Sequence, residues 1–310
     1  MHLLLTGSSG LIGTALVDAA LARGDTVTRL VRDSTDGRHP APTGVSSVAW
    51  DPSEGTIDTA ALDAAGPFDG AVHLAGAGVG DKRWSPDRKR EIIGSRTRST
   101  GLLARTIAAL TPAPPVLVSA SAVGYYGDRG DEVLTEASPA GSGFLARVCV
   151  DWEEAASPAA EADIRTVLLR TGIVLSRSGG ALAKQLPLFR LGVGGRIGSG
   201  RQFRSWITLD DQVAVILYSL GDATLSGPVN AVAPHPVTDA ELATALGRAL
   251  DRPSFMVVPA PALKLALGSE MATDMVLASQ RVRPEQLERS GFGFLHPDLD
   301  EALHSVLTGS

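Results

Sequence analysis

Hydrophobic and polar positions alternate in two ways along the first 175 residues of the chain. Short apolar runs, typical of strands buried in a parallel sheet, are separated by longer stretches in which apolar residues recur at helical spacing. The runs predict strands over 3–5, 26–31, 45–50, 71–74, 116–118 and 165–169, and the intervening stretches predict helices over 11–23, 58–65, 85–110 and 144–156. This alternation favours an α/β fold with a doubly wound parallel sheet.

The pattern changes from Gly179, where glycines interrupt a basic stretch. We interpret this stretch as the start of a smaller C-terminal substrate lobe. Its arginines favour an anionic substrate that carries phosphate or carboxylate, and they are Arg190, Arg196, Arg201 and Arg204. Downstream, the pattern predicts a helix over 210–220, a strand over 229–232 and a capping box from Thr238 to Glu241 at the start of another helix.

The turn after the first predicted strand has the sequence Thr6-Gly7-Ser8-Ser9-Gly10-Leu11-Ile12-Gly13. Gly7 permits a sharp turn, Gly10 lets backbone approach a pyrophosphate, and Gly13 lets the following helix pack close to the sheet. Amide groups at a helix N-terminus lack intrahelical partners, and together with the helix dipole they attract an anion. The motif therefore predicts that a dinucleotide binds at Gly7, Ser9, Gly10, Leu11, Ile12 and Gly13, with an ordinary tight turn as the alternative.

The second predicted strand is followed by Arg32, at a position where an acidic residue usually binds the adenosine ribose of NAD. A guanidinium instead suits a 2′-phosphate because it is planar and permanently charged, so Arg32 predicts NADP(H) as the cofactor. The alternative is a solvated arginine at a strand end. The small residues that end the 71–74 strand would let backbone run along the cofactor, which adds Leu74, Ala75 and Gly76 to the predicted site.

These patterns divide the chain into an NADP(H)-binding domain over 1–175 and a discontinuous substrate lobe mainly over 176–310. Segments from 205–235 are expected to return to the first domain, because the strand predicted over 229–232 can join the main sheet. The connection over 33–44 is rich in turn-forming residues and is expected to be exposed near the adenine end of the cofactor.

Composition narrows the class of protein further. A net charge of −6 over 310 residues argues against a nucleic-acid scaffold, and Arg88-Lys89-Arg90 is interpreted as one solvated helix face. Cys149 is the only cysteine, so no intramolecular disulfide forms, and the histidines lack metal-ligand spacing, so no metal site is predicted. Without a signal peptide or a long apolar run, we expect a soluble, cytoplasmic protein that does not contact membranes.

The motifs above, together with His73-Leu74-Ala75-Gly76 and Ser119-Ala120-Ser121, resemble those of extended short-chain dehydrogenase/reductases. More narrowly, Gly94-Ser95-Arg96, Asp151-Trp152-Glu153 and the segments 119–127 and 198–207 are similar to the atypical epimerase-family branch. That branch is often labelled nucleoside-diphosphate-sugar epimerase or SulA-type. The resemblance implies a Rossmann-like domain, NADP(H) and a poorly defined small-molecule substrate.

Extended members of this family use a Ser to orient the substrate, a Tyr to transfer a proton and a Lys four residues later to lower the pKa of that Tyr. No Tyr-x-x-x-Lys occurs in this chain, and Phe144 and Val148 stand where the family pattern places the pair. The resemblance puts Ser121 at the position of the Ser, and Tyr126 is the first candidate for a replacement proton donor, before Tyr125. Structural roles, in a turn for Ser121 and in packing for the tyrosines, are the alternatives.

The sequence thus predicts an NADP(H)-dependent oxidoreductase or epimerase-like protein that acts on an unknown small molecule. The alternative is a non-catalytic NADP(H)-responsive binding or regulatory protein, because the usual Tyr and Lys pair is missing. Further cationic side chains that would stabilise an anionic substrate or an oxyanion are Lys82, Arg96, Lys184 and Arg204.

Overall fold

The computed structural model describes residues 1–32 and 43–309, and its centre is an eight-stranded sheet in the order β13-β8-β6-β5-β1-β2-β3-β4. Every neighbouring pair is parallel except β3 and β4 at one edge. The strands are β1 (His2–Thr6), β2 (Thr26–Val31), β3 (Val45–Asp51), β4 (Thr56–Ile57), β5 (Gly70–His73), β6 (Val116–Ala122), β8 (Arg165–Thr171) and β13 (Gly227–Ala231). The predicted α/β, Rossmann-like fold is confirmed.

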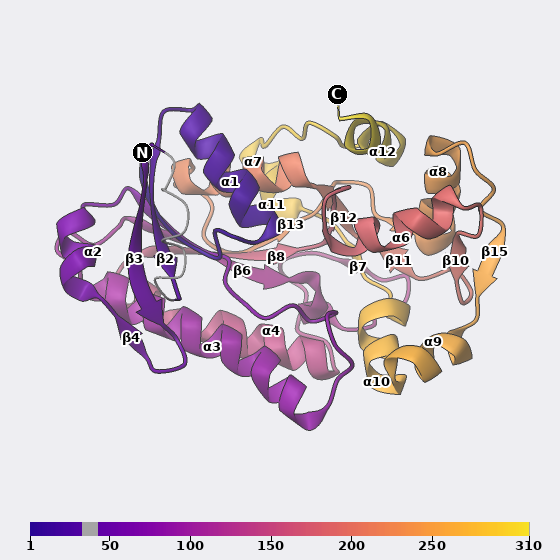
Figure 1. Ribbon diagram of the computed structural model, residues 1–310, viewed down its shortest axis with the longest axis horizontal. Coiled ribbons are helices and arrows are strands. Elements are labelled where there is room, and N and C mark those ends of the chain that lie inside the picture. Colours follow the sequence, from indigo (N-terminus) through magenta and orange to yellow (C-terminus); the bar gives the residue numbers. More distant parts are fainter. Residues whose placement is uncertain (33–42, 310) are drawn as a thin grey trace.

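Helices cover both faces of this sheet (Figure 1). They are α1 (Leu11–Ala22), α2 (Thr59–Ala65), α3 (Pro86–Ala109), α4 (Phe144–Glu154), α5 (Ser157–Glu161), α7 (Leu209–Gly221) and α11 (Glu285–Ser290). Side chains alternate across each strand, so Leu3 and Leu5 enter the core beneath α1 and α7, whereas Leu4 enters the core beneath α3. The sheet is therefore buried on both faces, which is why its strands read as continuous apolar runs.

Capping residues set the starts of two helices as the sequence predicts. The Ser85 hydroxyl accepts a hydrogen bond from the Arg88 amide at 3.1 Å, and Pro86 occupies the first helical position of α3. The α8 helix (Asp239–Ala249) begins with a complete capping box between Thr238 and Glu241. Local side-chain chemistry at these two ends is sufficient to define where the helix starts.

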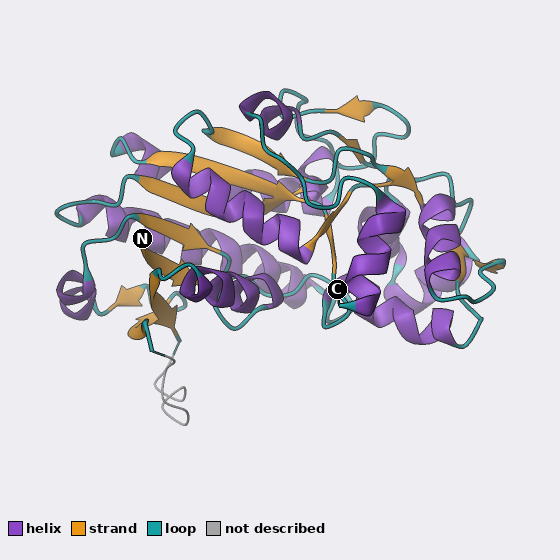
Figure 2. Cartoon of the chain, turned by 90° about the horizontal axis from the view of Figure 1, so that it is seen from above, coloured by secondary structure: helices purple, strands orange, loops and turns teal. Residues whose placement is uncertain are grey.

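A second group of shorter elements packs beside the carboxyl edge of the sheet, as Figure 2 shows. Its helices besides α8 are α6 (Gly180–Arg190), α9 (Ala260–Leu267), α10 (Ser269–Met271), a π-helical segment (Ala272–Leu277) and α12 (Leu299–Thr308). Four two-stranded sheets join β7 (Val133–Leu134) to β16 (Arg281–Val282), β9 (Ile173–Leu175) to β12 (Trp206–Thr208), β10 (Gly195–Ile197) to β15 (Met256–Val258), and β11 (Phe203–Arg204) to β14 (Val237–Thr238). Trp206 is fully buried in the core of this group.

Several elements differ from the sequence-based expectation, and two of them are instructive. Strand β6 continues to Ala122, well beyond the predicted end at Val118, because its last residues pair with β8 in the register Ser121↔Arg170. That pairing is long-range and overrides the weak strand propensity of Ser and Ala. The glycine-rich stretch contains the helix α6, which the sequence analysis did not predict.

Strand β13 pairs with β8 and so adds a segment from the second half of the chain to the main sheet. The connection expected near the adenine end lies outside the described residues, except for its last two positions. In the described part of the chain, no helix combines the length and the apolar character needed to cross a membrane.

Candidate functional site

The turn between β1 and α1, residues 7–13, is called the glycine turn below. Gly7 has a φ of +73°, and the Gly10 amide donates to the Gly7 carbonyl at 3.1 Å. A Cβ on Gly13 would lie 2.1 Å from the Gly7 oxygen, and a Cβ on Gly7 would lie 2.7 Å from the Leu74 carbonyl carbon. Only glycine fits these two positions without moving backbone, and the result is an α1 N-terminus that stands free of side chains.

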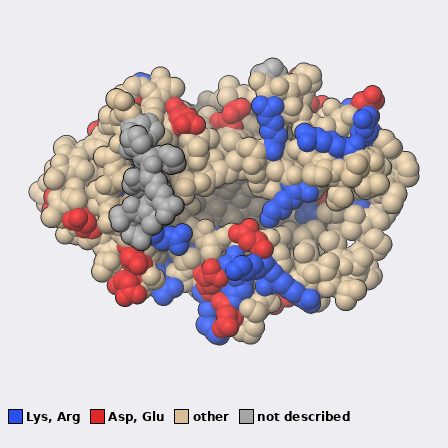
Figure 3. All heavy atoms as spheres, viewed as in Figure 1, with Lys and Arg blue, Asp and Glu red and all other residues tan. Residues whose placement is uncertain are grey.

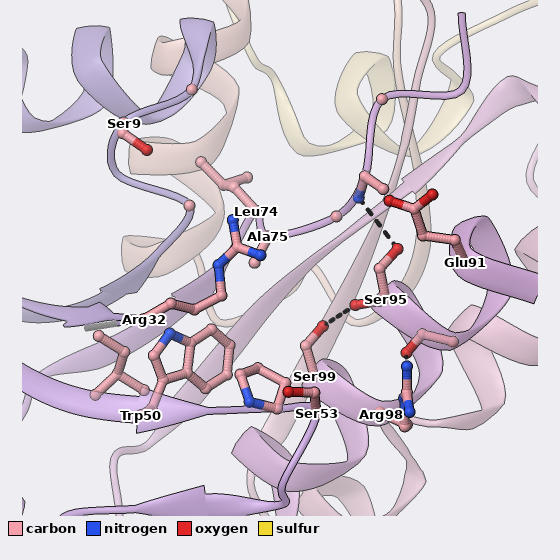
Figure 4. A pocket seen from close by; sticks show the side chains of 18 of the residues that line it. Ser9, Arg32, Trp50, Ser53, Leu74, Ala75, Glu91, Ser95, Arg98 and Ser99 are labelled. Carbon is pink, nitrogen blue, oxygen red and sulfur yellow. Dashed lines mark hydrogen bonds between the residues drawn. The ribbon is translucent and has the colours of Figure 1, made fainter. Parts of the chain in front are cut away.

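The glycine turn opens into a cavity of about 700 Å³ at the carboxyl edge of the sheet, called the large cavity below (Figure 4). Of the residues predicted to bind a cofactor, Gly7, Ser9, Gly10, Arg32, Leu74, Ala75 and Gly76 line it. Leu11, Ile12 and Gly13 are not among the lining residues but form the first turn of α1. Figure 3 shows the molecule hollowed at the centre of this face, with basic and acidic side chains at the rim.

One end of the large cavity is lined by Arg32, Trp50, Asp51 and Ser53, which follow or end β2 and β3. The Arg32 side chain extends toward Leu74 and Ala75, across the cavity (Figure 4). Hydrogen bonds from the hydroxyl and amide of Ser53 lower the pKa of Asp51, and the charge of Arg32 lowers it further. An exposed cation therefore stands at this end of the large cavity.

The chain between β5 and α3 forms the opposite wall and is held by two arginines. Arg96 is buried, donates to the carbonyls of Ala77 at 2.9 Å and Ile92 at 3.1 Å, and lies over the Trp152 ring. Burial lowers the pKa of Arg96. Arg96 thus supports the cavity wall from behind, which explains why it is not among the side chains that line the cavity.

Arg88 corrects one expectation, because it does not belong to a solvated helix face. It is 7% exposed, donates to the Gly78 carbonyl and pairs with Glu91 at 2.6 Å. Lys89 is half-buried and pairs with Glu270, and only Arg90 of the three is fully on the surface, paired with Asp87. A run of adjacent charges on a helix faces several directions, so one member of this run turns inward.

His73 lies at the end of β5 beneath the cavity and is fully buried. Its Nδ1 is 2.8 Å from the Thr6 hydroxyl, and its Nε2 is 3.1 Å from the Ser99 hydroxyl. Burial lowers the pKa of His73 to about 3, so the ring is neutral near pH 7. The Thr6 hydroxyl also accepts from the amides of Leu74 and Ala75, which fixes the start of the cavity wall. Within the described ranges, no group of His, Cys, Asp and Glu is arranged to hold a metal ion.

The candidate catalytic residues lie in a separate buried group, formed by β6, the 3₁₀ helix Val123–Tyr126 that follows it, α4, β8 and β13. The Ser121 hydroxyl donates to Glu153 Oε1 at 2.6 Å, and Arg170 donates to both oxygens of Glu153 at 2.8 Å. Arg170 Nη1 also donates to the Tyr126 hydroxyl at 3.1 Å, and that hydroxyl donates to Asn230 Oδ1 at 2.7 Å. We call these five residues the Ser121 network.

Neither candidate catalytic residue lines the large cavity. Ser121 is 3% exposed and Tyr126 is fully buried, and burial raises the pKa of Tyr126 to about 12. The hydrogen of the phenol already has a partner in Asn230. Sequence reasoning missed Arg170 and Asn230, although an arginine directly after the apolar run 167–169 of a predicted buried strand is a signal of a buried partner.

Where the sequence resemblance places the Tyr and Lys, the structure has an apolar cluster. Phe144 and Val148 are buried against Ile92 of α3, and the Trp84 ring packs edge-on against Phe144. Lys89 places its ammonium 5.0 Å from the centre of the Phe144 ring. This part of α4 therefore contributes packing, and the Ser121 network begins on the following turns of the same helix.

The remaining cations expected to meet an anionic substrate are dispersed. Arg204 is buried and pairs with Asp239 at 3.0 Å, and Arg196 donates to the Gly198 carbonyl. Lys184 is exposed, with its ammonium 3.8 Å from Asp81. Lys82, Arg190 and Arg201 are also exposed, and none of these side chains lines the large cavity.

Comparison with known proteins gives matches over nearly the whole chain. The family described as NAD dependent epimerase/dehydratase matches residues 3–231, and a domain of unknown function matches residues 258–306. An epimerase family protein from Mycobacterium tuberculosis is 44% identical over 98% of this chain and 97% of its own length. The human epimerase family protein SDR39U1 is 34% identical over 99% of this chain and 100% of its own length.

Solved structures agree with these matches. A crystal structure of human SDR39U1 with NADPH has a TM-score of 0.87 at 33% identity and covers 100% of both chains. A nucleoside-diphosphate sugar epimerase from Corynebacterium glutamicum has a TM-score of 0.77 at 36% identity, covering 99% of this chain and 58% of its own. The sequence resemblance is therefore confirmed, and the chain belongs to the NAD dependent epimerase/dehydratase family.

Proposed function

We propose that this protein is an NADP(H)-dependent oxidoreductase or epimerase-like enzyme that acts on a small molecule. The observation that carries the proposal is the large cavity, which runs from the glycine turn to Arg32. The positions of Gly7 and Gly13 leave no room for a Cβ, which meets the requirements of a dinucleotide-binding turn for a tight bend and for close packing of the following helix. The human relative is crystallised with NADPH, which supports the same cofactor here.

We propose residues of this chain that hold the pyrophosphate and the 2′-phosphate, and a backbone segment that runs along the cofactor. The free amides at the start of α1, at Leu11, Ile12 and Gly13, would hold the pyrophosphate. Arg32 would hold the 2′-phosphate, and the backbone of the segment 74–76 would run along the cofactor. NADP(H) supplies hydride chemistry when bound, and the protein supplies binding, orientation and exclusion of water.

For catalysis we propose that Ser121 orients the reacting oxygen and that Tyr126 is the candidate proton donor. Tyr126 would have to give up its hydrogen bond to Asn230 to act in this way, which is a cost that Ser121 does not carry. The rival function, an NADP(H)-responsive regulator without turnover, is favoured by one observation. The positions of the usual Tyr and Lys are packed apolar residues, Phe144 and Val148.

The first experiment is a titration of cofactor-stripped protein with NADPH and NADH, followed by nicotinamide fluorescence. We expect NADPH to bind more tightly, and Arg32→Ala to weaken NADPH binding about 10- to 100-fold while NADH binding is unchanged. Arg23→Ala is the matched control, because Arg23 is exposed and pairs with Asp25 outside the cavity. Failure of both nucleotides to bind would refute the proposed cofactor.

A second experiment separates the enzyme from the regulator. Oxidation of bound NADPH is followed during a screen of carbonyl compounds and nucleotide sugars. Stereospecific transfer of one hydride with a substrate supports the enzyme, whereas capture of a partner protein that depends on NADPH without turnover supports the regulator.

We also propose that the chain divides into two domains between residues 175 and 176, with the segment 205–235 returning to the first domain. The pairing of β13 with β8 supports this return. The proposed location of the protein is the cytoplasm.

A further inference from the structure

In its hydrogen bond with the neighbouring carboxylate, the Ser121 hydroxyl is the donor. The Ser121 hydroxyl donates to Glu153 at 2.6 Å, and Arg170 clamps the same carboxylate with two hydrogen bonds of 2.8 Å. The side chains of Arg170 and Glu153 are 3% and 10% exposed, so water competes little for these contacts. Glu153 Oε1 accepts from both Ser121 and Arg170, so Arg170 holds in place the oxygen to which Ser121 donates.

The chemistry of the two partners makes this direction obligatory. An ionised carboxylate only accepts hydrogen bonds, and a guanidinium only donates them. Arg170 is held in turn by the Tyr126 hydroxyl at 3.1 Å and by the Tyr125 ring, whose centre is 3.4 Å from the guanidinium carbon. Arg170 donates to both oxygens of Glu153, so both oxygens act as acceptors in this pair. The single hydrogen of Ser121 is therefore committed to Glu153, and only lone pairs are left for any other group.

The position of Ser121 puts those lone pairs at the edge where ligands meet a parallel sheet. Ser119 is in register with His73, the last residue of β5, and the chain beyond His73 lines the large cavity from Leu74 onward. Ser121 is two residues further along β6, at the level of that cavity wall on the neighbouring strand. Ligands of open α/β sheets bind outside the carboxyl ends of the strands.

We propose that Glu153 and Arg170 are positioning residues that make Ser121 a hydrogen-bond acceptor toward its ligand. The group that Ser121 recognises is then a hydrogen-bond donor, a hydroxyl or an amide, and not a carbonyl oxygen. Two sources supply such a group, the alcohol form of the substrate and the carboxamide of the nicotinamide. The inference rests on the proposed function, because it requires the cofactor to occupy the large cavity.

The test uses ligand pairs that differ only in the donor, with the full-length protein. The first pair is NADPH and its 3-acetylpyridine analogue, in which an acetyl group replaces the carboxamide and has no N–H. The second pair is cyclohexanol and cyclohexanone, titrated against the NADP⁺-loaded and the NADPH-loaded protein. In at least one pair, we expect the ligand that carries the N–H or O–H to bind about 10-fold more tightly than its counterpart, because one hydrogen bond of this kind contributes about 1.4 kcal/mol.

Three variants assign the discrimination to Ser121 and its partners. Ser121→Ala removes the acceptor and leaves the Arg170 and Glu153 pair intact, so the two members of the discriminating pair should bind equally. Glu153→Gln presents Ser121 with an N–H as well as an oxygen, so the preference should shrink. Tyr218→Phe is the control, because it removes the hydrogen bond of 2.8 Å to the Ser290 carbonyl, outside the Ser121 network and the large cavity, and it should lower thermal stability while the preference persists.

The pair that discriminates identifies the source of the donor. If neither pair is discriminated, or if Ser121→Ala keeps the wild-type preference, the inference is wrong. An equal loss of preference in Tyr218→Phe would also overturn it, because the effect would then follow stability and not the direction of the hydrogen bond. NADPH binding without discrimination refutes only this inference, whereas absence of NADPH binding refutes the proposed function itself.

Discussion

Along the carboxyl edge of the central sheet, the side formed by β1, β2, β3 and β5 is an open cavity walled largely by backbone and small residues. The side formed by β6, α4 and β8 is filled by buried polar side chains that are hydrogen-bonded to one another. The first side keeps amides and a cation free for a ligand, whereas on the second side the side chains of the Ser121 network are hydrogen-bonded to one another. Binding and chemistry in this fold therefore depend on different kinds of residue, and substitutions should separate them.

The largest expected effect is on the filled side. Arg170→Met removes the partner of a buried carboxylate, and we expect the free energy of unfolding to fall by about 3–5 kcal/mol. Chemical denaturation with urea measures it. Arg248→Met is the control, because Arg248 pairs with Asp300 where both side chains are 65% exposed, and its loss should be below about 1 kcal/mol. Equal losses in the two variants would mean that the Ser121 network does not stabilise the fold.

The next effect concerns the open side. Gly13→Ala places a Cβ 2.1 Å from the Gly7 oxygen, so the glycine turn must move, and we expect NADPH affinity to fall about 100-fold or more, which is about 2.7 kcal/mol. Fluorescence titration gives the dissociation constant. Gly221→Ala is matched to it, because nothing lies within 4 Å of that Cβ, and it should bind NADPH as the wild type does. Normal affinity in Gly13→Ala would place the pyrophosphate elsewhere.

The two sides also differ in how far the sequence predicts them. The glycine turn is local, since Gly7, Gly10 and Gly13 lie within one strand-to-helix connection whose backbone requirements are visible in the residue types. The Ser121 network joins residues up to 104 positions apart, as in the bond from Tyr126 to Asn230, and local patterns carry no information on such contacts. The same limit explains the missed end of β6, which depends on pairing with β8, and the inward turn of Arg88.

A third prediction probes the boundary between the two sides through His73. In the folded protein the pKa of His73 is about 3, below its usual value of 6.5. Between these two pH values, the His73 ring is protonated in the unfolded chain and neutral in the folded protein. The contribution of the neutral His73 ring to the free energy of unfolding is fully present above pH 6.5. It falls by about 1.4 kcal/mol per pH unit as the pH is lowered toward 3. Between pH 7 and pH 5, the wild type should lose about 2 kcal/mol more than His73→Gln.

Urea denaturation at both pH values measures this difference. The slope of the free energy of unfolding against pH is compared, because the hydrogen bonds that His73→Gln loses lower stability equally at both pH values and cancel from the slope. His304→Gln is the control, because His304 is exposed and its replacement should leave the wild-type slope unchanged. A His73→Gln slope equal to that of the wild type would show that the ring takes up a proton in the folded protein, and the cavity wall would then rest on a charged group.

The smallest effect tests a side chain that holds the open side in shape. Arg88→Ala deprives the Gly78 carbonyl and Glu91 of their partner, and we expect the free energy of unfolding to fall by about 1 kcal/mol. Arg90→Ala, two residues along the same helix, loses only an exposed pair with Asp87 and should change stability by less than about 0.5 kcal/mol. Urea denaturation of the two variants decides between them. If Arg90→Ala costs as much as Arg88→Ala, then the burial of Arg88 adds nothing beyond a surface pair, and the wall between β5 and α3 is held by its other contacts, such as those of Arg96.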